Sequence, residues 1–101
     1  MAASLGILVR SCDHLDKLIR LTKAARKKRI DVTIFLTHLG TLLIQDPKFP
    51  ELEDLAEITV CRVAFESHGM TPADVDRDES LFATQAKHAD MIYECDRYVV
   101  F

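Results

Sequence analysis

Three short, almost continuously apolar runs constrain the fold of this chain most strongly. They span residues 4–10, 31–37 and 58–61, and they are rich in the β-branched residues that favour strands. Such runs are typical of strands that are covered on both faces, as in a parallel sheet. Residues 11–30 separate the first two runs, which leaves room for the helical crossover that joins neighbouring parallel strands.

The segments between these runs predict helices. After the first run, apolar positions recur at helical spacing up to about residue 28 or 29: Leu15, Leu18, Ile19, Thr22 and Ala25. We expect short helices at 39–44 and 51–57, a loop held by two prolines at 46–50, and a helix after Cys61 that stops at Gly69.

The last third of the chain is less regular. Residues 70–79 are polar and acidic, which predicts a surface connection with a stub of strand near Val75. Ser80 is a good N-cap for a helix with these apolar positions: Leu81, Phe82, Ala86, Ala89, Ile92 and Tyr93. Residues 97–101 predict a last, buried strand. We therefore expect one α/β domain over residues 1–101, a three-layer α/β/α sandwich with a mostly parallel sheet of four to five strands.

Composition narrows the functional classes. With 49% hydrophobic and 29% charged residues the chain is typical of a soluble globular protein, and no apolar run is long enough for a bilayer. The start lacks a basic leader, so we expect no signal peptide. Three cysteines at no metal-ligand spacing favour a reducing cytoplasm. We expect no metal and no cofactor, since no glycine-rich phosphate loop is present either.

Charge is unevenly distributed along the chain. Residues 1–45 carry a net charge of +5 and residues 46–101 a net charge of −8, which together give −3. The basic run from Lys23 to Arg29 could dock an acidic protein or a nucleic acid, or it could be a solvated helix end whose charges complement the helix dipole. We favour the dipole interpretation. No aromatic residues interleave the run, so we do not expect a nucleic acid partner.

Cys61 is the strongest candidate for chemistry, because it lies where a strand ends and a helix begins. The unpaired N–H groups of the helix start and the adjacent Arg62 both favour a thiolate, the reactive form of cysteine. The alternative is a small apolar filler, since unpaired cysteines are often buried.

Three candidate residues follow directly after strands: Cys12, His38 and Cys61. In an open parallel sheet they should all lie along the carboxyl edge, with Cys95 at the opposite edge. His38 could tune a thiolate or act as an acid, or it could be a loop histidine bonded to backbone. Cys12 could supply a second thiol, or it could be partly packed. His68 and His88 are expected on helix surfaces.

Four features give the chain a resemblance to a known family. They are the first strand entering a helix at Ser11, the run 32–37 followed by Gly40, Val60-Cys61 with Gly69 eight residues on, and the ending 95–101. The chain thus resembles the DsrE/DsrF-like proteins, which include the TusD-type sulfur-relay subunits. The resemblance implies a three-layer α/β/α fold, assembly as a dimer, trimer or hexamer, and a match between Cys61 and the cysteine that carries a persulfide.

We therefore expect a cytoplasmic sulfur-relay protein that holds sulfane sulfur on Cys61 and passes it between donor and acceptor proteins. Arg62, His38 and Cys12 are the expected tuning residues. Whether the chain is an enzyme, as a sulfurtransferase, stays open. One alternative is a non-catalytic assembly or binding subunit of the same fold. Another is a thiol redox protein in which Cys12 resolves an oxidised Cys61.

Overall fold

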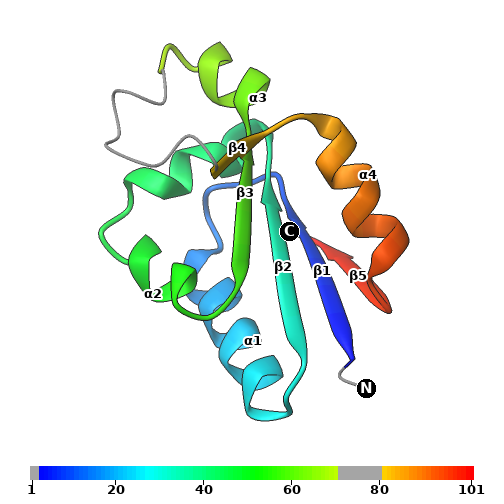
Figure 1. The fold of residues 1–101 in the computed structure, drawn as a ribbon. Helices are drawn as coiled ribbons and strands as arrows, with labels where there is room; N and C mark the ends of the chain where they lie inside the picture. Colours follow the sequence, from blue (N-terminus) through cyan, green and yellow to red (C-terminus); the bar gives the residue numbers. More distant parts are fainter. Residues whose placement is uncertain (1–2, 71–80) are drawn as a thin grey trace.

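A parallel sheet of five strands forms the centre of the structure, a computed structural model that describes residues 3–70 and 81–101. The strand order is β4-β3-β2-β1-β5, and all neighbouring pairs are parallel (Figure 1). The strands are β1 (Ser4–Val9), β2 (Asp31–Leu36), β3 (Glu57–Cys61), β4 (Phe82–Ala83) and β5 (Arg97–Val100). The predicted α/β fold is confirmed.

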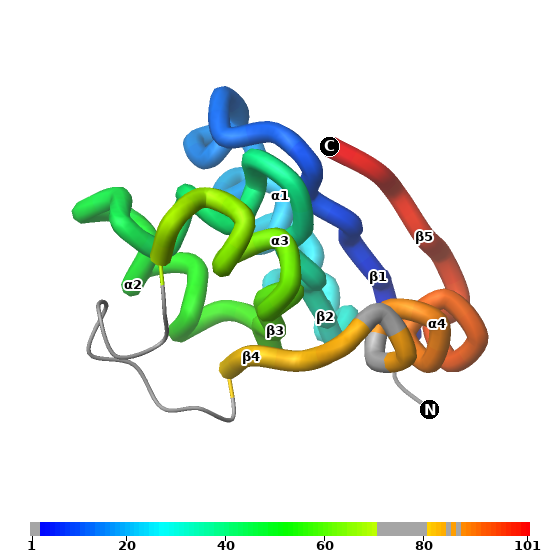
Figure 2. Tube along the Cα trace, turned by 90° about the horizontal axis from the view of Figure 1, so that it is seen from above, coloured from blue at the N-terminus to red at the C-terminus, as the bar shows by residue number. Residues whose placement is uncertain are grey.

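Helices cover both faces of the sheet. They are α1 (Leu15–Lys27), the 3-10 helix η1 (His38–Gln45), α2 (Phe49–Glu53), α3 (Arg62–Ser67) and α4 (Gln85–Glu94). The chain steps from β1 to β2 to β3 with α1 and α2 on one face, and α4 returns over the other face to β5 (Figures 1 and 2). Right-handed crossovers require this arrangement, because the direction of travel across the sheet reverses after β4. None of the described helices combines the length and apolar character needed to cross a membrane.

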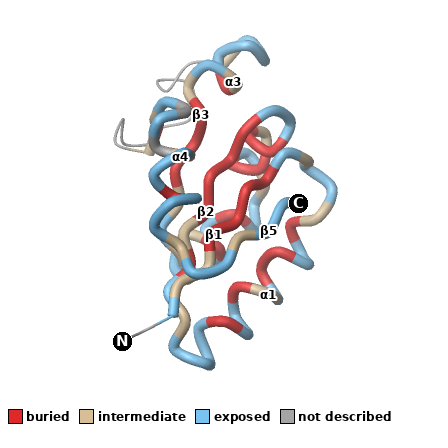
Figure 3. The backbone as a smooth tube through the Cα atoms, turned by 90° about the vertical axis from the view of Figure 1, so that its right-hand side faces the viewer, coloured by how far each residue is buried: buried red, intermediate tan, exposed pale blue. Residues whose placement is uncertain are grey.

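Side-chain alternation along the strands separates two cores. Ile7, Ile34 and Val60 face α1 and α2 and belong to the larger core. Their neighbours Leu8, Phe35 and Cys61 belong to a smaller core on the opposite face, which Met91 of α4 covers. Buried residues accordingly concentrate in the central strands and on the inner side of α1 (Figure 3).

The predicted helix that starts near Ser80 is wrong at residues 82–83. Phe82 and Ala83 form the short edge strand β4, and the helix begins only at Gln85. The Phe82 ring lies 4.9 Å from the ring of Phe65, so packing against α3 outweighs the local helical pattern. The expected strand near Val75 and the expected N-cap at Ser80 lie outside the described residues.

The predicted buried face of this helix is also wrong. Tyr93 is 93% exposed and Ile92 is 45% exposed, whereas Met91 is buried. The strand β5 that follows was expected to be buried, yet it is an edge strand and most of its residues are exposed. The proline-held loop at 46–50 is shorter than expected, because α2 already starts at Phe49 with Pro50 in its first turn.

A close backbone approach fixes the start of η1. The Gly40 amide donates to the Thr37 carbonyl (2.9 Å), and the Thr37 amide donates to the Val9 carbonyl (2.9 Å). A Cβ at Gly40 would lie 2.2 Å from the Val9 carbonyl oxygen, which is backbone and cannot rotate away. Only glycine therefore allows η1 to sit against the end of β1.

We predict that Gly40→Ala lowers the free energy of unfolding by about 3 kcal/mol, because the backbone must move apart to admit the methyl group. Urea denaturation of the purified protein measures the change. Gly69→Ala is the control: Gly69 has a φ of +80° and nothing within 4 Å of the place that a methyl group would take, so only about 1 kcal/mol of backbone strain is expected. Equal losses in the two variants would contradict the close-approach argument.

Candidate functional site

A pocket of about 340 Å³ lies beyond the carboxyl ends of β2 and β3. It forms where η1, which follows β2, packs against α3, which follows β3. Its lining residues are Thr37, His38, Cys61, Val63, Ala64 and Ser67. Ligands of open parallel sheets bind at this edge, so the topology places the pocket where function is expected.

Cys61 occupies the predicted junction. It is the last residue of β3 and the N-cap of α3, and strand alternation directs it to the face covered by α4. Cys61 is only 2% exposed and packs in a core with Leu8, Phe35 and Met91. The residue therefore lines the pocket while remaining almost entirely shielded from bulk water.

His38 shares the pocket with Cys61, as the edge argument predicts. Its φ of 49° is in the left-handed region, an uncommon conformation for a residue other than glycine. The His38 carbonyl accepts a hydrogen bond from Thr41 Oγ1 (2.9 Å), and His68 Nε2 lies 3.1 Å from the same oxygen. The side chains of Thr41 and His68 thus hold the backbone of His38 at the pocket that Cys61 also lines.

Cys12 and Arg62 are placed differently. Cys12 is exposed, its Sγ lies 3.7 Å from Asp13 Oδ1, and it lines a separate pocket of about 210 Å³ with Asp46 and Lys48. The strand β2 stands between β1 and β3, the strands that precede Cys12 and Cys61. Arg62 is half-buried as the first residue of α3, and it is absent from the lining of the Cys61 pocket. His38 shares the pocket of Cys61, whereas Cys12 and Arg62 do not line it.

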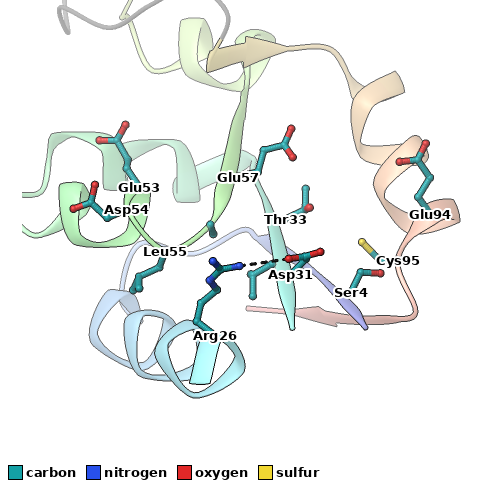
Figure 4. Close-up of a pocket in the computed structure, with 12 residues that line it drawn as sticks. Ser4, Arg26, Asp31, Thr33, Glu53, Asp54, Leu55, Glu57, Glu94 and Cys95 are labelled. Carbon is teal, nitrogen blue, oxygen red and sulfur yellow. Dashed lines mark hydrogen bonds and ion pairs between the residues drawn. The ribbon is translucent and has the colours of Figure 1, made fainter. Parts of the chain in front are cut away.

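Cys95 lies at the opposite edge, as predicted, in a pocket of about 520 Å³ (Figure 4). Carboxylates surround this pocket: Asp31, Glu53, Asp54, Glu57 and Glu94. Burial raises the pKa of the Cys95 thiol. A hydrogen bond with Ser4 lowers this pKa, and the charges of Glu94 and Asp96 raise it further. A thiolate is disfavoured there, so the larger pocket is the poorer site for sulfur chemistry. Within residues 3–70 and 81–101, no cluster of His, Cys, Asp and Glu is arranged to hold a metal ion.

His88 was expected on a helix surface, but it contributes to the core beneath α4. Its ring stacks on Phe35 with 5.3 Å between centroids, and its Nε2 shares a hydrogen bond with the Tyr98 hydroxyl (2.9 Å). Burial lowers the pKa of His88 and raises that of Tyr98. The signal in the sequence is that His88, Met91 and Cys95 share helical spacing, which marks the true inner face of α4.

We predict that His88 makes the fold sensitive to mild acid. In the unfolded chain it takes up a proton near its ordinary pKa of 6.5, whereas the folded chain resists protonation until a lower pH. The free energy of unfolding should therefore fall as the pH drops below 6.5, and His88→Gln should reduce this loss. Urea denaturation at about pH 7.5 and about pH 5.5 measures it. The control is His68→Gln, at an exposed position; if both variants behave alike, the assignment to His88 fails.

Comparison with protein-family models and with curated proteins gives no match to this chain.

Proposed function

We propose that this protein carries sulfane sulfur as a persulfide on Cys61 in the reducing cytoplasm and passes it to a partner thiol. The observation that supports the proposal most is the placement of Cys61 in a pocket at the carboxyl edge of the sheet together with His38. A persulfide needs a thiol that is reachable by a small reactant but shielded from bulk water and oxidants, and the low exposure of Cys61 fits this need. The resemblance to sulfur-relay proteins agrees with this function.

The proposed step is an exchange of one S–S bond for another. The Cys61 thiolate attacks the terminal sulfur of a donor persulfide R–S–SH, and a bond forms between the two sulfur atoms. The original S–S bond breaks, and its electron pair leaves with the donor as R–S⁻. Cys61–S–SH then gives up its outer sulfur to an acceptor thiolate in the same way. No external oxidant or reductant is required.

We predict that the reduced protein gains the mass of sulfur after incubation with polysulfide and that Cys61→Ser abolishes this gain. Intact-mass spectrometry measures the loading. Cys12→Ser and Cys95→Ser are matched controls, and both should load as the unchanged protein does. Loading that persists in the Cys61 variant would assign the chemistry to another thiol.

We also predict that His38→Asn slows the loading of Cys61 about tenfold or more, because a neighbouring imidazole can hold or move the thiol proton. Asparagine tolerates the left-handed backbone that His38 adopts, so the fold should be retained. The control is His14→Asn, at a position that lines a different pocket with Val100 and Phe101. A loading rate that is unchanged in His38→Asn would show that the imidazole takes no part.

The packing of Cys61 among Leu8, Phe35 and Met91 favours one alternative, a non-catalytic assembly subunit in which the thiol only fills space. In that case a mild alkylating reagent should modify Cys61 only after unfolding, and polysulfide should add no mass. A redox function that uses Cys12 with Cys61 gains no support from their separate pockets. Its mark would be a disulfide between them after treatment with peroxide.

A further inference from the structure

The solvent face of α1 carries a continuous stripe of positive charge. We define the α1 stripe as the exposed residues Lys17, Arg20, Lys23, Lys27 and Lys28. They lie on the side of the helix opposite to its buried positions Leu15, Leu18, Ile19, Thr22 and Ala25. In Figure 3 the buried side of α1 faces the sheet and the exposed side faces outward along the whole helix.

These charges are not balanced within the described chain. The acidic residue of α1, Asp16, bonds to Lys48 at 3.0 Å, and Arg26 pairs with Asp31 at 3.4 Å. No ion pair is found for the α1 stripe among the described residues. Like charges three and four residues apart on a helix repel one another, so the stripe weakens the isolated fold.

The helix dipole accounts for only part of the stripe. Cations are favourable near the last turn, where Lys27 and Lys28 lie, and the effect fades within one turn. Lys17, Arg20 and Lys23 lie before the last turn of α1, where the dipole gives them no support. A partner with dense negative charge would account for the whole stripe.

The chemistry of the stripe selects among anionic partners. None of the large apolar side chains that are exposed in the described chain lies on α1. Protein interfaces are anchored by buried aromatic and apolar residues, and membrane-surface helices insert an apolar face. Val100, which is 55% exposed, lines a pocket with Lys17 at one end of the stripe, but no such anchor lies along the rest of it. Long cationic side chains without an apolar anchor between them fit a phosphate backbone.

We propose that the α1 stripe binds the phosphate backbone of a nucleic acid duplex. The absence of aromatic residues argued against a nucleic acid at the sequence level, but it bears on stacking with single-stranded bases and not on duplex phosphates. From Lys17 to Lys28 the helix rises about 16 Å, a length over which a duplex presents roughly ten phosphate charges. Phosphate contacts carry no sequence information, so binding through the α1 stripe should be independent of sequence.

The test is fluorescence anisotropy of a labelled duplex of about 20 base pairs, titrated with the full chain at several salt concentrations. Five phosphate contacts predict an affinity that falls about 500-fold between about 50 and about 200 mM salt. The double variant Arg20→Gln with Lys27→Gln should lose two contacts and reduce this fall to about 40-fold. The matched control is Arg10→Gln with Arg97→Gln, which removes the same charge from exposed positions outside the stripe and should bind as the unchanged chain does.

Several results would overturn the proposal. If the chain does not bind the duplex, or if both double variants lose binding equally, the α1 stripe is not the contact. Tighter, stripe-dependent binding to polyglutamate or to phosphatidylserine vesicles would assign the stripe to an acidic protein or a membrane surface. Parallel titrations with DNA and RNA duplexes identify which duplex the stripe prefers. Persulfide loading of Cys61 should be the same in both double variants, so this test is separate from that of the proposed function. Circular dichroism confirms that each variant is folded.

Discussion

The contact between Gly40 and the end of β1 is the constraint on which the candidate site depends. The segment after β2 does not extend into solvent, because the Thr37 amide is bonded to the Val9 carbonyl and Gly40 packs directly on that group. This ties η1 across the carboxyl edge of the sheet. His38 is thereby held in the pocket that Cys61, the last residue of β3, also lines. The site is built from segments at the ends of the adjacent strands β2 and β3, and β1 anchors the segment after β2.

The two faces of the sheet have different physical roles. The face toward α1 and α2 is an extended apolar core, which stabilises the fold by removing hydrocarbon from water. The face toward α4 is smaller and mixed, with the bonded pair His88 and Tyr98 close to a cluster that includes Cys61. Burial of polar groups on this face is tolerated because they bond to one another. Cys61 therefore lies on the face of the sheet that carries more polar groups.

The fold follows from the sequence wherever one short-range pattern dominates. The apolar runs predict the bounds of β1, β2 and β3 to within one residue at each end, and the position of Cys61 at the end of β3 follows from them. The last third depends on distant contacts. Phe82 joins a strand because it pairs with Val60, and His88 turns inward because it finds Phe35 and Tyr98. The shared pocket of His38 and Cys61 follows from topology, whereas the exclusion of Cys12 depends on three-dimensional detail that spacing does not encode.

The position of β5 has a consequence for how the molecule is made. β1 is an inner strand of the finished sheet, yet one of its two neighbours, β5, is formed by residues 97–100. Bonds between Ser4 and Asp96 join residues 92 positions apart. During synthesis, β1 therefore keeps one open edge until β5 has emerged. Such long-range closure is slow compared with local pairing, and the open edge leaves a nascent chain prone to association.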